Sequence, residues 1–286
     1  METLIALALA AVIVGVQDKT YDFKLESKSV QGHKCEQAER EFVKMIMKVN
    51  DQPVAKSEKF KEFAASEEIL SVDSDQGTKR RWTFSKAKRK TEGSIVPYIF
   101  QGKSVVLTDA KGKHPVFVLE GGGELTKEDL EDLRSYAGLK KEGRPSGAEL
   151  FAPDKPVKVG TTWTKDLKKI VEAMLGNEMA KQVDPAASRV SFTLKSVENR
   201  GGAEYGKISG FTELSFIAFG PLKLDRPIAM KFTVDIDACI DGTLPDGEMK
   251  MRGEMYGKSP AATEKGQVEI ELDFTLEASR TVKSSK

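Results

Sequence analysis

The sequence has few of the side chains that enzymes use for nucleophilic or metal chemistry. Its 286 residues include two cysteines, Cys35 and Cys239, and two histidines, His33 and His114. These residues form no Cys-x-x-Cys pair and no spacing typical of a zinc site. The chain also has no Gly-x-Ser-x-Gly sequence, so a catalytic triad would need a histidine buried beside a nucleophile and an acid. We therefore predict no catalytic residue, no cofactor-binding residue and no metal ligand.

The chain also lacks an excess of charge of either sign. Although 31% of its residues are charged, lysine and arginine number 45 and the acidic residues 44, which gives a formal net charge of +1. A balanced chain produces no overall field that attracts nucleic acid or another polyanion, so any such affinity must be local. The apolar share of 39% is enough for a substantial core, and we expect a folded protein.

Only one long apolar run is present, from Leu4 to Val16. It is too short to span a bilayer comfortably, and polar residues follow it directly. We interpret residues 1–17 as a secretory signal peptide, although Glu2 stands where a basic residue is usual. An uncleaved anchor and an apolar first strand are the alternatives. The protein is therefore predicted to be secreted or periplasmic, with no transmembrane segment in the mature chain.

In an oxidising compartment Cys35 and Cys239 could form a disulfide, which would close a very long loop. Nothing in the sequence brings the two residues together. We therefore expect two free thiols, with the disulfide as the alternative.

Alternation of apolar and polar residues predicts long strands along most of the chain. The predicted strands are 21–25, 43–49, 81–87, 105–108, 116–119, 157–163, 189–197, 205–219, 228–241, 248–256 and 268–282. The segment 35–40 could instead be helical, because it is rich in helix formers and has no β-branched residue.

Two helices are predicted from their capping residues. Thr126 and Asp129 resemble a capping box at the start of one helix, and Gly138 is placed to end it. Asp166 is a candidate N-cap of the second helix.

These elements predict an α+β fold with long antiparallel β-sheets in two halves, each accompanied by a helix. The first half is 18–140 and the second is 157–286, because 141–156 is rich in glycine, proline and charge and is typical of a linker.

Three aspartates, Asp235, Asp237 and Asp241, lie close together and could suggest a calcium loop. The spacing does not fit an EF-hand, because Cys239 stands where an oxygen ligand is needed and Ile240 where glycine is needed. Period-two alternation instead predicts a strand with one polar face. An ion site at the surface remains the alternative.

This strand is predicted to form a hairpin with the next one, through a four-residue loop at 244–247. That loop would set Asp241 opposite Lys250 and Ile240 opposite Met251, so that apolar residues face each other.

The run from Lys79 to Lys90 combines seven basic residues with Trp82 and Phe84. Such a mixture can bind nucleic acid, anionic lipid or acidic polysaccharide. Alternation puts both aromatic residues on one strand face, so we predict that they are core and that the basic residues are solvated. An anionic envelope surface is the alternative partner, whereas nucleic acid is not expected for an exported chain.

Two stretches, PVKVGTTW at 156–163 and SVENRGGAEYGKI at 196–208, together with the leader, resemble a family of bacterial exported β-rich proteins of unknown function. The resemblance covers mainly residues 150–286. It implies an extracytoplasmic location and a β-rich architecture, and it provides no catalytic residue.

Long antiparallel strands that wrap around helices can leave an apolar cavity, as lipid-carrying proteins do. The aliphatic, Met and Phe content of 211–219 and 228–255 fits such a cavity as well as a filled core. We therefore predict a non-catalytic exported protein that binds an apolar ligand or contacts the envelope. A carboxylate-dependent hydrolase outside the cytoplasm is the alternative, although the sequence singles out no pair of acids.

The leader makes a direct prediction. Because the apolar run precedes a polar sequence, protein recovered from its native cell should begin between about Val12 and Tyr21. N-terminal sequencing of the recovered protein measures this, and an intact Met1 would contradict export by a cleaved signal.

Overall fold

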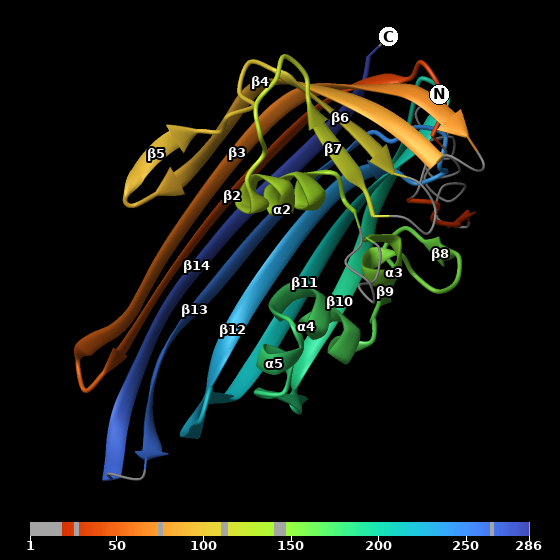
Figure 1. Ribbon diagram of the computed structural model, residues 1–286. Coiled ribbons are helices and arrows are strands. Elements are labelled where there is room, and N and C mark those ends of the chain that lie inside the picture. The colour runs from red at the N-terminus through yellow and green to blue at the C-terminus, as the bar shows by residue number, and fades with distance from the viewer. Residues whose placement is uncertain are drawn as a thin grey trace, which may run out of the picture.

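The structure, a computed structural model, describes residues 19–25, 29–73, 77–109, 114–139, 147–263 and 266–285. The chain is mostly β, with 66% of its residues in strands and 10% in helices. Twelve strands form one antiparallel sheet, in the order β7-β6-β4-β3-β2-β14-β13-β12-β11-β10-β9 with β5 paired to β4 (Figure 1). Strands β1 and β8 form a separate two-stranded sheet.

The strands of the first part of the chain are β1 (Thr20–Tyr21), β2 (Lys34–Val49), β3 (Gln52–Asp73), β4 (Gly77–Thr91), β5 (Ser94–Pro97), β6 (Ser104–Asp109) and β7 (Val116–Leu119). Those of the second part are β8 (Val157–Lys158), β9 (Thr162–Trp163), β10 (Val183–Arg200), β11 (Ala203–Phe219), β12 (Leu222–Cys239), β13 (Gly247–Thr263) and β14 (Gly266–Ser284). The helices are α2 (Lys127–Tyr136), α3 (Gly147–Phe151), α4 (Leu167–Leu175) and α5 (Asn177–Ala180).

The prediction of an α+β fold with separate sheets in two halves is wrong. Strand β2 pairs with β14 along nearly its whole length, from Cys35 opposite Ser284 to Val49 opposite Ile270. The hairpins of both halves therefore join into one twelve-stranded sheet, and the four short helices of the described residues pack against it. Of the predicted linker, 141–146 lie outside the described residues, and α3 begins directly after them.

Three local predictions also fail. Of the predicted strand 21–25, only Tyr21 belongs to a strand, β1. Residues 35–40 belong to β2 and are not helical, because pairing with both β3 and β14 outweighs their helix propensity. The predicted strand 157–163 is divided, since β8 pairs with β1 whereas β9 pairs with β10. The predicted signal peptide lies outside the described residues.

Both predicted helix starts are confirmed. Thr126 accepts a hydrogen bond from the Asp129 N–H while the Asp129 side chain accepts one from the Thr126 N–H, and the helix ends just before Gly138, whose φ is 64°. The side chain of Asp166 accepts hydrogen bonds from the N–H groups of Lys168 and Lys169 at the start of α4.

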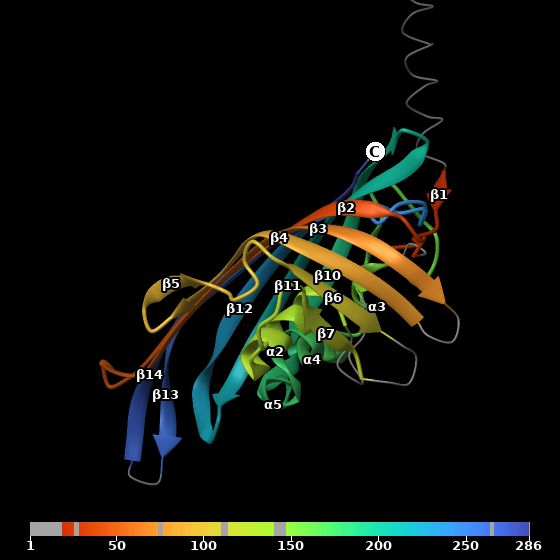
Figure 2. The same cartoon turned by 45° about the horizontal axis from the view of Figure 1, so that its top comes forward.

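The helices α2, α4 and α5 lie on one face of the sheet, which we call the inner face (Figures 1 and 2). Strand pairing aligns this face across the molecule, since Phe63, Glu39, Arg280, Met249 and Ile236 stand opposite one another in successive strands. Helix α2 covers the inner face of β3, β4, β6 and β7, and α4 with α5 covers β11 and β12 and the nearby part of β13. The opposite face is called the outer face.

The stretch that contains the three aspartates forms the predicted hairpin, β12–β13, but in another register. Lys250 stands opposite Asp235 and not Asp241, a shift of six residues. An even shift keeps every side chain on its predicted face, so Ile236 still meets an apolar partner, Met249. The shift arises because the connection is longer than four residues and folds back, with the Cys239 N–H donating to the Asp246 carbonyl at 3.0 Å.

A close contact between these two strands predicts a stability effect. A Cβ added at Gly253 would lie 2.5 Å from the buried ring of Phe232, so Gly253→Ala should destabilise the protein by about 1–3 kcal/mol through overpacking. Urea unfolding measures the difference. The control is Glu254→Ala on the exposed outer face of the same strand, which should change the free energy of unfolding by less than about 0.5 kcal/mol; equal effects of the two changes would contradict the packing argument.

Candidate functional site

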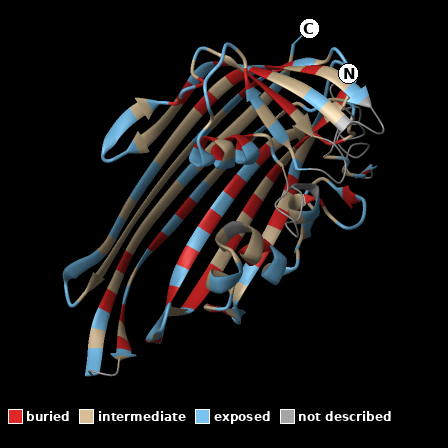
Figure 3. Ribbon diagram, viewed as in Figure 1, coloured by how far each residue is buried: buried red, intermediate tan, exposed pale blue. Residues whose placement is uncertain are grey.

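The inner face of the two central strands carries apolar side chains between the two parts of the sheet that the helices cover. Val43, Met45 and Met47 of β2 stand opposite Leu276, Phe274 and Leu272 of β14. We call the five half-buried members of this group, Val43, Met45, Met47, Phe274 and Leu276, the apolar stripe. Figure 3 shows β2 and β14 mostly in the colour of intermediate burial, beside the buried bands of β12.

The apolar stripe is incompletely packed. Met47 and Phe274 contact the core under α4 and α5, but Val43, Met45 and Leu276 belong to none of the buried clusters formed by the described residues. Each of these three side chains keeps an intermediate exposure. An apolar surface that remains partly exposed in the middle of a sheet is typical of a binding site and costs free energy when nothing covers it.

One end of the apolar stripe meets charged residues under α2. The Lys61 ammonium lies 2.6 Å from an Asp132 carboxylate oxygen, and the Tyr98 hydroxyl donates to the other oxygen at 2.6 Å. Burial alone would lower the pKa of Lys61, but the hydrogen bond to Asp132 and the negative charges of Asp132, Glu41 and Glu39 together outweigh it and raise the pKa. Burial, together with the same carboxylate, raises the pKa of Tyr98. Lys61 therefore stays charged and Tyr98 stays a donor at neutral pH.

Glu39 lies beside this pair on β2. Burial raises the pKa of its carboxyl, whereas the charge of Arg280, 3.7 Å away, opposes the shift. The Arg280 guanidinium also lies 5.9 Å from the centre of the Tyr136 ring of α2. The acids under α2 thus face cations, which favours ion pairs that attach α2 to the sheet over the paired acids of a hydrolase.

The surface therefore combines an apolar area with a charged border. Such a border can orient the polar end of a ligand whose apolar part lies on the sheet. This site could not be predicted from the sequence, because it depends on which distant strands become neighbours. The only local signal was the alternation of Val43, Met45 and Met47.

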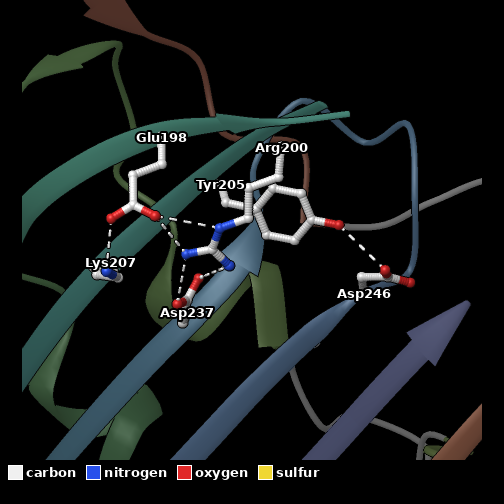
Figure 4. A network of polar contacts seen from close by, with 6 residues as sticks. All are labelled: Glu198, Arg200, Tyr205, Lys207, Asp237 and Asp246. Carbon is white, nitrogen blue, oxygen red and sulfur yellow. Dashed lines mark hydrogen bonds and ion pairs between the residues drawn. The ribbon is translucent and has the colours of Figure 1, made fainter. Parts of the chain in front are cut away.

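The three aspartates do not form a common site. Asp237 receives two hydrogen bonds from the Arg200 guanidinium on the outer face, at 3.0 and 2.9 Å (Figure 4). Arg200 also bonds Glu198, which in turn accepts from Lys207 at 2.6 Å. Asp235 stands opposite Lys250. Among the described residues, no group of three or more histidine, cysteine or acidic side chains could hold a metal ion.

Asp241 organises the loop that follows β12. It accepts hydrogen bonds from the Thr243 N–H and hydroxyl, from the Glu204 N–H and from the Cys239 thiol. Burial alone would raise the pKa of Asp241, but these hydrogen bonds lower it overall. Asp246 of the same loop accepts from the Tyr205 hydroxyl, also shown in Figure 4, and from the Ser284 N–H, so the carboxylates of this loop hold backbone in place.

Both cysteines are free and buried. Burial raises the pKa of the Cys35 thiol to about 12, and the thiol donates to Glu67 at 3.2 Å. A protonated, buried thiol is neither a nucleophile nor a metal ligand at neutral pH. Cys239 packs instead with Ala203 and Tyr205.

His33 is the one histidine that meets a serine and an acid, but the order does not suit a triad. Its Nε2 lies 3.4 Å from the Ser284 hydroxyl, which donates to Asp246 at 2.5 Å. The acid therefore contacts the serine directly and does not orient the histidine. His114 is exposed.

The burial of Trp82 and Phe84 on one face of β4 is as predicted. The basic residues are not all solvated, because the side chains of Arg80 and Arg89 lie on the same inner face and are only 27% and 20% exposed. Five of its seven basic residues lie near carboxylates of neighbouring elements; these are Arg80, Arg81, Lys86, Arg89 and Lys90. This pairing reduces the local field that an anionic surface would feel. Within the described ranges, no helix is both long and apolar enough to cross a membrane.

Because α2 is attached to the sheet through Asp132, we predict that removing this acid costs more stability than removing another acid of the same helix. Asp132→Ala leaves Lys61 and Tyr98 without their partner in a site where the Asp132 side chain is only 10% exposed, so it should cost about 2–4 kcal/mol. Glu128→Ala removes an acid that is 68% exposed and should cost less than about 0.5 kcal/mol. Urea unfolding at neutral pH measures both, and equal costs would show that the Asp132 contacts do not hold the helix.

No protein-family model matches the sequence, and no curated protein matches it. Among solved structures, the chain is similar to an outer membrane channel from Pseudomonas putida, with 7% identity and a TM-score of 0.22 over 91% of this chain and 97% of the other. It is also similar to DynF from the dynemicin biosynthesis pathway of Micromonospora chersina, with 8% identity and a TM-score of 0.15 over 90% of this chain and 83% of the other. Likeness at this level supports no conclusion about fold or function.

Proposed function

We propose that the protein is a non-catalytic binding protein that holds an apolar ligand on the inner face of its sheet. The observation that carries the proposal is the apolar stripe, in which Val43, Met45 and Leu276 stay partly exposed at the centre of the sheet. Helices cover the inner face on both sides of the stripe, so a ligand there would complete the apolar layer.

The outer face supports the same choice of surface. Its side chains form ion pairs between strands, such as Lys258 with Glu271 at 2.9 Å and Arg189 with Glu213 at 2.8 Å. Such pairs keep much of this face well solvated. Phe42 and Ile46 of β2 are nevertheless half-buried apolar side chains on the outer face, and a shallow hollow of about 390 Å³ there is lined by Phe42 together with charges of both signs, such as Arg40 and Lys250.

An extracytoplasmic location remains part of the proposal. It rests on the apolar leader and on the resemblance of residues 150–286 to bacterial exported proteins. In that setting an apolar ligand would need a carrier or a binding surface, because it is poorly soluble in water.

Two neighbouring residues of β2 test the proposal. Met45 lies in the apolar stripe and Ile46 on the outer face, and both are half-buried. Met45→Gln should weaken binding of the neutral apolar dye Nile red about fivefold, because the lost apolar contact is worth on the order of 1 kcal/mol. Ile46→Gln should change the affinity less than about twofold. Dye fluorescence measures the affinity.

Melting curves of the two variants show whether each remains folded at the temperature of the titration. Wild-type protein that shows no saturable dye binding would refute the proposal. Equal weakening by the two variants would also refute it, since only one of the two side chains faces the proposed ligand.

A further inference from the structure

An exposed lysine borders the apolar stripe. Lys59 of β3 stands directly opposite Val43 of β2, and the same row continues to Leu276 of β14. Cross-strand neighbours share a sheet face and lie about 5 Å apart, so the Lys59 ammonium is within reach of anything that lies on Val43.

Lys59 differs from the other cations of this part of the inner face. Lys61 is 2.6 Å from Asp132, Arg89 is 2.9 Å from Glu128, and Arg280 is 3.7 Å from Glu39. In the part of the chain that the structure describes, Lys59 has no ion-pair partner. Lys59 thus places a positive charge without an ion pair among the described residues beside the apolar surface, with Glu41 at the next inner-face position of β2.

We infer that the ligand of the apolar stripe is a fatty-acid-like amphiphile whose carboxylate pairs with Lys59 while its alkyl chain covers Val43, Met45 and Leu276. This inference rests on the proposed binding of an apolar ligand. The charge of one ammonium matches one negative charge. A doubly charged head such as a phosphate monoester is disfavoured, because Glu41 occupies the next inner-face position of β2 after Val43.

A matched pair of ligands and a matched pair of variants test the inference. Dodecanoate and dodecan-1-ol share one alkyl chain and differ in charge. Lys59→Glu reverses the charge beside the apolar stripe, whereas Lys56→Glu reverses the charge of another exposed lysine, which stands opposite Ile46 on the outer face. Each ligand is titrated against protein loaded with Nile red, and displacement of the dye reports its affinity at low salt.

Wild-type protein should bind dodecanoate about two- to fivefold more tightly than dodecan-1-ol, and added salt should reduce this preference. Lys59→Glu should reverse the preference with little change in the affinity for the alcohol. Lys56→Glu should keep the wild-type preference, because its side chain lies on the other side of the sheet.

Three results would overturn the inference. Equal affinity of wild-type protein for acid and alcohol, or equal effects of the two charge reversals, would show that Lys59 does not bind the head group while leaving the proposed function intact. If neither ligand displaces the dye and wild-type protein also fails to bind the dye, the proposed function fails with it. Melting curves confirm that both variants are folded.

Discussion

The backbone pairing of β2 with β14 is the contact on which the rest of the architecture depends. It joins strands that lie more than two hundred residues apart and places the last strand of the chain at the centre of the sheet. Without it, the molecule would be two sheets with open central edges, which favour aggregation. As a result of this pairing, β2 and β14, which join the two parts of the sheet, are also the strands farthest from the helical connections at its edges.

This distance explains why the apolar stripe is uncovered. Helix α2 follows β7 at one edge of the sheet, and α4 and α5 precede β10 at the other. Each helix group covers the strands nearest to its own edge. The central strands receive apolar residues from the same alternation as their neighbours, but no helix of the described chain is long enough to span them. The apolar stripe thus stays uncovered because of the strand order. Its charged border consists of the residues that attach α2 to the sheet.

Local features could be predicted from the sequence because their causes are local. The burial of Trp82 and Phe84 follows from alternation, and the capping box of Thr126 follows from residues three positions apart. The register of β12–β13 could not be predicted, because Asp241 and Asp246 bind backbone from other strands and lengthen the loop. Because the register differs by an even number of residues, each side chain of β12 and β13 still lies on its predicted sheet face. Alternation therefore predicted the faces correctly but not the cross-strand partners.

The fold class and the candidate site could not be predicted for a related reason. The sequence of β2 does not specify β14 as its pairing partner, since many strands of this chain share the same alternation of apolar and polar residues. The position of Lys59 beside Val43 and Leu276 exists only once β3, β2 and β14 are neighbours. In the sequence, the charges and the apolar residues are therefore visible only as separate features.

The sulfur content of the apolar stripe has a chemical consequence. Met45 and Met47 have flexible, polarisable side chains that can adapt to ligands of different shape, which a surface of branched residues could not do as readily. The same thioethers are open to oxidation where they remain accessible, and a sulfoxide at Met45 would place a polar group in the middle of the contact area. An alkyl chain bound on the apolar stripe would shield the Met45 sulfur. A higher fraction of ligand-bound protein would therefore mean slower oxidation of this methionine.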